Sequence, residues 1–180
     1  MKATGIVRRI DSLGRIVIPR EIRRAMRIKE GDCIEIYTDK QGDIILSKYS
    51  PMGELENCCR ELADSMALTL GKLVIITDNE KILAVSGVGK GLFKNRLISS
   101  ELRQLILKRN LYCIQKDASK VVSVIKETEV NFESQIVGPI VADGEVIGSV
   151  IILSDEKHEL TESDRLMVRC AAGFFGKQME

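Results

Sequence analysis

The stretch TGIVRRIDSLGRIVIPREIRRAMRIKEGDCIEIY, residues 4–37, carries the pattern that decides the fold of the N-terminal part. Two segments rich in β-forming residues, Gly5–Ile10 and Arg15–Ile18, lie on either side of Asp11-Ser12-Leu13-Gly14. Aspartate, serine and glycine between two such segments are typical of a turn. The stretch therefore predicts that the chain begins with a hairpin of two strands.

A short helix and a second hairpin are expected next. Pro19 suits the first turn of a helix, which we expect to run to about Arg27, before Gly31-Asp32 breaks the chain. Cys33–Thr38 and Ile44–Lys48 then predict two more strands, joined by a polar loop. The expected order is β-β-α-β-β.

A domain of about fifty residues buries too little surface to be stable alone, and usually needs a metal, disulfides or a partner. The chain has one histidine and five cysteines, Cys33, Cys58, Cys59, Cys113 and Cys170, with no Cys-x-x-Cys spacing. We therefore expect no metal site, no cofactor and reduced thiols in a cytosolic protein. A second copy of the chain, exchanging strands, would supply the missing core.

Charge is unevenly divided along the chain. Residues 1–50 hold eleven Lys/Arg and seven Asp/Glu, whereas the other 130 residues hold sixteen and nineteen. Within residues 1–29 the bias rises to nine basic against two acidic side chains. This asymmetry favours a polyanion-binding module attached to a second part with another role.

Arginine accounts for most of this charge. Four arginines recur at i, i+3, i+4 and i+7 of the predicted helix: Arg20, Arg23, Arg24 and Arg27. Ile22 and Met26 lie on the opposite side, where we expect them to hold the helix against the sheet. A guanidinium binds phosphate and guanine edges bidentately. On this pattern alone, a DNA-binding face and a merely solvated helix surface remain equally good interpretations.

The same stretch resembles the AbrB family of transition-state regulators, including its G-R-[IV]-V-I-P core at Gly14–Pro19. The resemblance implies a swapped-hairpin β-barrel of two intertwined chains that binds double-stranded DNA. It assigns the DNA contacts to Arg8, Arg15, Arg23 and Arg24. Arg9, Arg20 and Arg27 are expected to contribute less.

A joint follows near Tyr49–Gly53. Ser50 is placed to cap a helix that has Pro51 at its first position, runs from about Glu54 to Leu70 and stops at Gly71. The expected seam of this helix is Leu55, Cys59, Leu62, Met66 and Thr69. We predict a DNA-binding domain at residues 1–50, a linker and first helix at 51–71 and a second domain at 72–180.

The second domain reads as an antiparallel sheet with helices, so the fold class is α+β. The expected strands are Leu73–Thr77, Ile82–Ser86, Tyr112–Gln115, Val121–Lys126, Ser134–Ala142 and Glu145–Leu153. Asp143-Gly144 marks the clearest hairpin turn. A helix is expected at about Ser100–Lys108, and a last one begins at Thr161 with Asp164 completing a near capping box. The apolar face expected for this last helix is Leu166, Met167, Cys170, Ala171, Phe174 and Phe175.

Residues 51–180 resemble a GAF domain, notably at Ile136–Ser154 and Ala171–Glu180. The whole chain resembles regulators that join an AbrB-like module to a GAF domain. This resemblance implies that the protein is a cytoplasmic, nucleoid-associated transcription regulator of sporulation. The flanking helices of such domains commonly pair between subunits, which implies a homotetramer, although both seams are equally suited to packing on their own sheet. Two dimerising surfaces in one chain thus favour the tetramer over the dimer.

The residues also bear on membrane insertion, secretion and three alternative functions. No apolar run reaches the length of a membrane span, and the first five residues show no secretory signal. An antitoxin uses the same N-terminal module but usually appends a short disordered tail. A methionine sulfoxide reductase of GAF type needs a reactive cysteine in a cationic setting, which the sequence does not identify. An unknown small ligand, bordered by Ser86–Gly89 and the loop to Phe93, is slightly favoured over a purely assembling domain.

Overall fold

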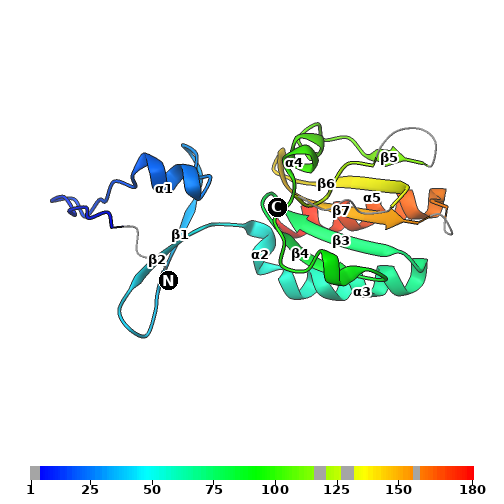
Figure 1. The fold of residues 1–180 in the computed structure, drawn as a ribbon, viewed down its shortest axis with the longest axis horizontal. Helices are drawn as coiled ribbons and strands as arrows, with labels where there is room; N and C mark the ends of the chain where they lie inside the picture. The colour runs from blue at the N-terminus through cyan, green and yellow to red at the C-terminus, as the bar shows by residue number, and fades with distance from the viewer. Residues whose placement is uncertain (1–4, 116–120, 127–131, 156–158) are drawn as a thin grey trace. The chain divides into compact units, whose positions relative to one another are not determined.

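The computed structural model describes residues 5–115, 121–126, 132–155 and 159–180. The chain divides into two compact units, Met1–Tyr49 and Ser50–Glu180, which are described separately (Figure 1).

The first unit contains one short helix and one two-stranded sheet. Helix α1 spans Arg20–Ala25, and strands β1 (Ile34–Thr38) and β2 (Ile44–Lys48) pair antiparallel with Ile36 opposite Leu46. The predicted helix end at Arg27 is wrong by two residues. Arg27 adopts a left-handed backbone with φ of 55°, and the amide of Ile28 donates to the Arg23 carbonyl at 2.8 Å, which turns the chain out of the helix.

The predicted strands at Gly5–Ile10 and Arg15–Ile18 are absent from the described chain. The turn between them is nevertheless formed. The amide of Asp11 donates to the Arg15 carbonyl at 3.1 Å, and the amide of Gly14 donates to the Asp11 carbonyl at 3.0 Å. A strand needs a neighbouring strand to pair with, and no strand is assigned on either side of this turn within the described residues of this single chain.

This turn repeats in the hairpin of β1 and β2. There the Asp39 amide donates to the Asp43 carbonyl at 3.1 Å, and the Gly42 amide donates to the Asp39 carbonyl at 3.2 Å. In both turns the aspartate carboxylate also accepts two backbone amides, and the glycine has a positive φ, 76° at Gly14 and 87° at Gly42. The first turn is thus built as a hairpin turn.

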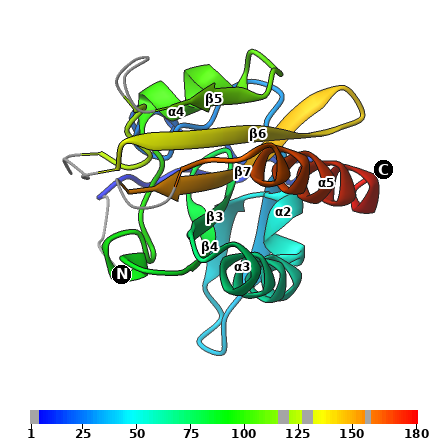
Figure 2. The same cartoon turned by 90° about the vertical axis from the view of Figure 1, so that its right-hand side faces the viewer.

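The second unit is built on a five-stranded antiparallel sheet in the order β4-β3-β7-β6-β5 (Figure 2). Its strands are β3 (Leu73–Asp78), β4 (Ile82–Ser86), β5 (Tyr112–Ile114), β6 (Ser134–Ala142) and β7 (Glu145–Ser154). The predicted hairpin of β6 and β7 is confirmed. Asp143 and Gly144 both have positive φ, 48° and 74°, as a two-residue type I′ turn requires.

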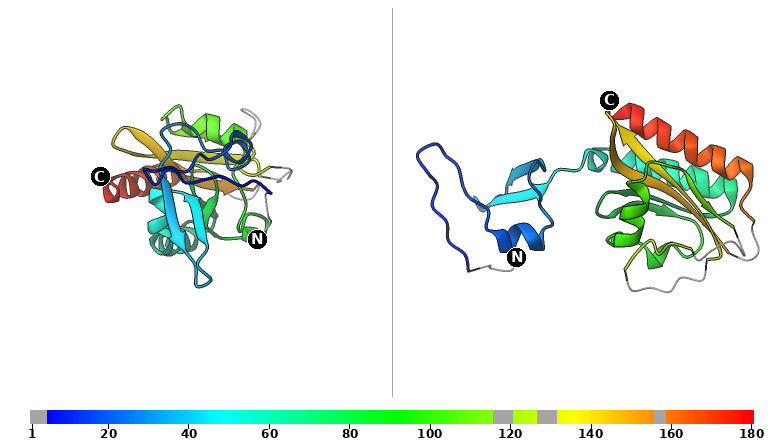
Figure 3. Two further views of the ribbon diagram at one scale, coloured as in Figure 1. Left: turned by 90° about the vertical axis from the view of Figure 1, so that its left-hand side faces the viewer. Right: turned by 90° about the horizontal axis from the view of Figure 1, so that it is seen from above.

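Helices cover both faces of this sheet (Figure 2). One face packs against α2 (Pro51–Glu54), α3 (Glu56–Leu70) and α5 (Glu162–Gln178), through Ile76 and Ile152 among others. The other face packs against α4 (Ser100–Ile106) and the residues after the short 3-10 helix η1 (Lys90–Leu92). Figure 3 gives two further views of these layers. The sheet therefore separates two apolar cores.

The predicted helix signals behave unequally. Gly71 ends α3 in the left-handed conformation, and Thr161 with Asp164 forms the complete capping box of α5, as predicted. Ser50 precedes α2 but its hydroxyl makes no cap. Instead the Ser50 hydroxyl donates to Asp78 Oδ2 at 2.9 Å.

The predicted strand at Val121–Lys126 is wrong. Only an isolated bridge between Ile98 and Ile125 is present there. The side-chain amide of Gln135 on β6 takes the place of a neighbouring strand: its Oε1 accepts from the Val122 amide, and its Nε2 donates to the Val122 carbonyl, each at 3.0 Å. A side chain that satisfies the backbone in this way removes the need for a ladder.

The face predicted for the last helix is also partly wrong. Leu166, Cys170 and Phe174 are exposed, whereas Val168 and Ala172 are buried against the sheet. Two glycines explain why α5 turns a different face toward the sheet from the one predicted. A Cβ on Gly176 would lie 2.4 Å from the Val141 carbonyl oxygen, and a Cβ on Gly138 would lie 2.4 Å from Val168 Cγ1. The close approach of α5 to β6 selects the face that carries these positions. The seam predicted for α3 is likewise incomplete: Cys59 and Met66 are buried, but Thr69 is exposed.

Candidate nucleic-acid interface

Helix α1 presents arginine to solvent. Pro19 is buried at its N-cap, and Arg20, Arg23 and Arg24 are all exposed. None of these three arginines makes an ion pair with another described residue. Arg23 and Arg24 lie in the last turn, where a positive charge interacts favourably with the helix dipole. The helix therefore carries cations that are not neutralised by neighbouring carboxylates.

The predicted stripe of four arginines is shortened to three. Arg27 is half-buried and lies beyond the end of α1. Ile22 is half-buried as expected, but Met26 is 41% exposed and does not anchor the helix within this chain. The cause is the early end of α1 at Ala25, which takes both residues out of the helical register.

Arg15 is positioned by Asp11. Its Nε donates to Asp11 Oδ2 at 2.7 Å, and its backbone amide donates to Asp11 Oδ1 at 2.9 Å. These bonds, the backbone bond foremost, hold the pKa of Asp11 below its ordinary value. The guanidinium stays exposed, and its two terminal nitrogens bind no other described residue. Asp11 thus aims Arg15 without covering the nitrogens that would bind a phosphate.

Arg8 and Arg9 are exposed on the extended arm before this turn. The Arg8 Nη1 donates to the carbonyl of Val7 at 3.2 Å. Because successive side chains of an extended chain point to opposite sides, Arg8 and Arg9 serve different faces. This alternation fits the expectation that Arg8 contributes more to DNA binding than Arg9.

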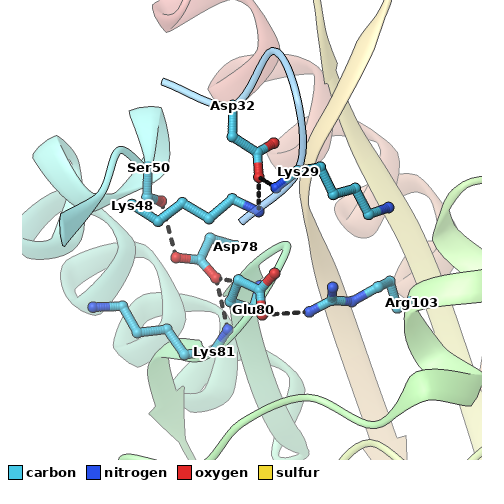
Figure 4. A network of polar contacts seen from close by, with 8 residues as sticks. All are labelled: Lys29, Asp32, Lys48, Ser50, Asp78, Glu80, Lys81 and Arg103. Atoms are coloured by element: carbon cyan, nitrogen blue, oxygen red, sulfur yellow. Dashed lines mark hydrogen bonds and ion pairs between the residues drawn. The ribbon is translucent and has the colours of Figure 1, made fainter. Parts of the chain in front are cut away.

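A second positioning carboxylate escaped the sequence reading. Asp32 Oδ2 accepts from the Lys29 amide at 2.8 Å and from Lys48 Nζ at 3.1 Å (Figure 4). The Lys29 amide and the Lys48 ammonium together hold the pKa of Asp32 below its ordinary value. These contacts fasten the loop after α1 to the end of β2. The sequence predicts only a chain break at Gly31-Asp32, and the one signal for this role is that Asp again lies beside Gly at a turn.

The cysteines of the second unit include two whose environment disfavours the reactive thiolate form. Burial raises the pKa of the Cys59 thiol to about 12, and burial raises that of Cys113 as well. Thiols in this state are poor nucleophiles. No group of three or more metal-ligating side chains occurs among the described residues. A search of the same residues finds no helix with the length and apolar character of a membrane span.

The loop expected to border a ligand, from Ser86 to Phe93, is buried in the core at both of its ends. Phe93 is fully buried, and its ring centroid lies 6.3 Å from that of Phe132. Ser86 is buried at the end of β4, and Gly87 lies so close to Lys72 that a Cβ would be 2.5 Å from its carbonyl oxygen.

Two family models match the chain. The model described as "Stage V sporulation protein T C-terminal, transcription factor" matches residues 54–180. The model described as "Antidote-toxin recognition MazE, bacterial antitoxin" matches residues 7–54.

Two proteins of Bacillus subtilis (strain 168) are similar in sequence. Stage V sporulation protein T is 46% identical over 180 residues, covering 100% of this chain and 99% of that protein. The transition state regulatory protein AbrB is 48% identical over 75 residues, covering 42% of this chain and 77% of that protein. The resemblance of the N-terminal stretch to the AbrB family is thereby confirmed.

Two solved structures share the fold of the second unit. The GAF domain from a phosphoenolpyruvate-protein phosphotransferase of Coxiella burnetii has a TM-score of 0.56 at 13% identity, covering 69% of this chain and 82% of that one. The type II free methionine-R-sulfoxide reductase from Thermoplasma acidophilum has a TM-score of 0.55 at 17% identity, covering 73% and 95%. At these identities the likeness concerns the fold alone, and it confirms the GAF-type architecture and the α+β class.

Proposed function

The chain belongs to the stage V sporulation protein T family of transcription factors, and on that premise we propose how it holds DNA: through arginines of an intertwined N-terminal dimer. It is a DNA-binding transcription regulator of sporulation, with an AbrB-type N-terminal domain and a GAF-type second domain. We assign residues 1–50 to the DNA-binding domain, residues 51–71 to the linker and first helix, and residues 72–180 to the GAF domain.

The DNA contacts are assigned to Arg8, Arg15, Arg23 and Arg24. Three observations support the assignment: all four are exposed, Arg23 and Arg24 make no ion pair with a described residue, and Arg15 is aimed by Asp11. Arginine side chains of this kind bind phosphate and guanine edges. Arg9, Arg20 and Arg27 play a smaller part, Arg27 because it is half-buried.

The dimer rests on the arm before α1. Its turn has the hydrogen bonds of a hairpin turn, yet the arms on either side have no strand partner in the described chain. Apolar side chains on these arms are left in solvent, Val7 at 84% and Val17 at 74% exposure. A second copy that exchanges hairpins would pair these arms and bury those side chains.

A second self-association surface lies on α5. Leu166, Cys170 and Phe174 follow one another at intervals of four residues, so they form one exposed apolar stripe along the helix. Paired stripes from two GAF domains would join two N-terminal dimers into a homotetramer. Such a protein, bound to DNA, would be associated with the nucleoid in the cytoplasm.

Other functions have weaker support. We propose that the chain is not an enzyme, because the pKa values of the buried Cys59 thiol and of the exposed Cys113 thiol are both raised and the family is one of transcription factors. The antitoxin-type model ends at residue 54, and the rest of the chain follows a transcription-factor model. Sensing of a small ligand by the GAF domain remains a secondary proposal, which a thermal-shift screen of metabolites on the full chain tests.

The salt dependence of DNA binding tests the arginine assignment. Four arginines from each of two chains would engage about eight phosphates, so the slope of log K against log salt is expected to be roughly −7. Replacing Arg23 and Arg24 by Gln should bring the slope to about −3.6, because four of the eight contacts are lost. The matched control, Arg60→Gln with Arg169→Gln, removes the same charge from the second unit. Equal slopes for the two double variants would overturn the assignment.

A further inference from the structure

The second unit, although acidic in total, contains one strongly basic segment. Residues 81–109 hold seven basic side chains and one acidic side chain, whereas the rest of residues 51–180 holds nine basic and eighteen acidic. The basic residues are Lys81, Lys90, Lys94, Arg96, Arg103, Lys108 and Arg109. The acidic balance of the whole unit hides this concentration of positive charge, which neither the fold nor the assigned DNA contacts explain.

The basic segment (residues 81–109) occupies one side of the domain. After β4 it runs through η1 and α4, which lie over the sheet face opposite α3 and α5 (Figure 2). Its apolar residues, such as Phe93 and Leu102, are fully buried in the core beneath. The segment is therefore a covering layer that turns its charged side chains outward, away from the face that carries the exposed stripe of α5.

Three cations of the segment are exposed on the turn that contains Phe93. Lys90, Lys94 and Arg96 lie within three residues of Phe93 in the sequence, and none of the three makes an ion pair with a described residue. Backbone bonds close the turn: the Phe93 amide donates to the Lys90 carbonyl at 3.1 Å, and the Arg96 amide donates to the Phe93 carbonyl at 3.3 Å. The buried Phe93 ring thus attaches this turn to the core of the second unit.

The remaining arginines differ in this respect. Arg103 pairs with Glu80 at 2.6 Å, and Arg109 lies 3.7 Å from Glu145. Their charges are partly balanced by a neighbouring carboxylate. The unbalanced charge of the segment is therefore concentrated in Lys90, Lys94 and Arg96.

Ser50, the first residue of the second unit, is hydrogen-bonded to the turn at which the basic segment begins. The Ser50 hydroxyl donates to Asp78 Oδ2, and Asp78 Oδ1 accepts from the amides of Glu80 and Lys81, both at 2.7 Å (Figure 4). Only Tyr49 and Ser50 separate β2 from α2. The GAF domain is therefore carried on a very short connection, which raises the effective concentration of its basic segment around any DNA that the N-terminal domain holds.

We propose that the basic segment, centred on Lys90, Lys94 and Arg96, is a second DNA-contacting surface that binds the phosphate backbone of the same duplex. The chemistry is that of unpaired ammonium and guanidinium groups meeting phosphates, so the contact adds affinity without reading bases. Duplex DNA is favoured over another polyanion because the chain belongs to a family of DNA-binding regulators and only two residues separate β2 from α2.

Charge reversal at equal net charge tests the proposal in the full chain. Lys90→Glu with Lys94→Glu should lower the slope of log K against log salt by about 1.8 for each chain whose segment engages, and should weaken binding about tenfold or more at moderate salt. The control, Arg60→Glu with Lys177→Glu, makes the same charge change on α3 and α5 and should leave the slope nearer to that of the parent. Size-exclusion chromatography and circular dichroism confirm that both variants keep their assembly and fold.

A second pair of variants separates charge from folding. Lys90→Arg with Lys94→Arg should keep the parent affinity, whereas Lys90→Gln with Lys94→Gln should lose part of it on a long duplex. If both charge-reversal variants have the same affinity and slope, the segment does not contact DNA, and the proposal is overturned. The proposal would be overturned equally if Lys90→Glu with Lys94→Glu abolished binding of an acidic protein but left DNA binding unchanged.

Discussion

The ion pair of Lys72 and Asp164 is the most deeply buried charged contact that the structure describes, and its removal should be costly. Lys72 Nζ lies 2.7 Å from Asp164 Oδ2, and the two side chains are 8% and 1% exposed. The same carboxylate accepts from the amide and the hydroxyl of Thr161 at 2.6 and 2.8 Å. Asp164 therefore links the beginning of β3 to the beginning of α5.

Asp164→Ala leaves Lys72 buried without its partner. Breaking a buried pair from one side costs about 3–5 kcal/mol, and loss of a helix cap costs about 1 kcal/mol. Because both effects act through one carboxylate they overlap, so we expect the GAF domain to lose about 4 kcal/mol of its unfolding free energy. Chemical denaturation of the full chain, followed by far-UV circular dichroism, measures this loss.

Lys72→Met combined with Asp164→Ala supplies the control. The double variant has no uncompensated buried charge, so it should recover much of the stability that the single variant loses. A single variant that loses less than about 1 kcal/mol, or a double variant no more stable than the single one, would refute the reasoning.

The pH dependence of this contact has a defined sign. The contacts from Lys72 and Thr161 outweigh burial and hold the pKa of Asp164 below its ordinary value of 3.8. A carboxyl whose folded pKa is lowered adds stability that is complete above the unfolded value and disappears as the pH falls through the folded value. The stability difference between the parent and Asp164→Asn should therefore be constant near neutrality and shrink below about pH 4.

Three further predictions concern the other features. Gly14→Ala should destabilise the first turn by about 1 kcal/mol and weaken DNA binding, because Gly14 has a φ of 76°; urea denaturation and DNA titration would each contradict this if unchanged. Leu166→Glu with Phe174→Glu should convert a tetramer into dimers in sedimentation measurements, since it places charge in the exposed stripe of α5; an unchanged mass would exclude that stripe as an interface. A thiol reagent at neutral pH should label Cys170 quickly and Cys59 only on unfolding, because Cys59 is buried with a pKa of about 12; rapid modification of Cys59 in the folded chain, located by mass spectrometry, would contradict its burial.

Local signals predicted the parts of the fold that are determined locally. Strand β4 and the hairpin of β6 and β7 lie within a residue of their predicted bounds, because strong β-propensity and an Asp-Gly turn act over neighbouring residues. Gly71 and the Thr161 capping box behave as predicted for the same reason. Each of these features is decided by a few adjacent residues, whatever the rest of the chain does.

The failures involve contacts between residues far apart in the sequence. The face of α5 depends on Gly138, which lies on β6 and lets Val168 approach closely. The missing strand after residue 121 depends on a bond from Gln135 to Val122. Periodicity contains neither contact, so it predicted an apolar face and a strand where tertiary packing favours another arrangement.

The candidate site depends on sequence in both ways. The exposed positions of Arg23 and Arg24 follow from helical spacing, which the sequence supplies directly. The orientation of Arg15 depends on Asp11, for which the sequence predicts only a place in a turn. A carboxylate beside a DNA-binding arginine looks unfavourable by charge alone, and only its hydrogen bonds show it to be a positioning group.

The two Asp-x-x-Gly turns connect the fold to the proposed dimer. At Asp39 the turn joins strands that pair with each other, whereas at Asp11 the same hydrogen bonds join arms that form no strand among the described residues. A turn of one kind imposes similar entry and exit directions on its arms, so the Asp11 arms leave their turn as the arms of a hairpin do. Arg15 lies on one of these arms, while Arg24 lies on α1. If the arms pair with a second copy, each DNA-binding surface combines Arg15 and Arg24 in an arrangement that depends on the dimer, and DNA affinity should fall together with dimerisation.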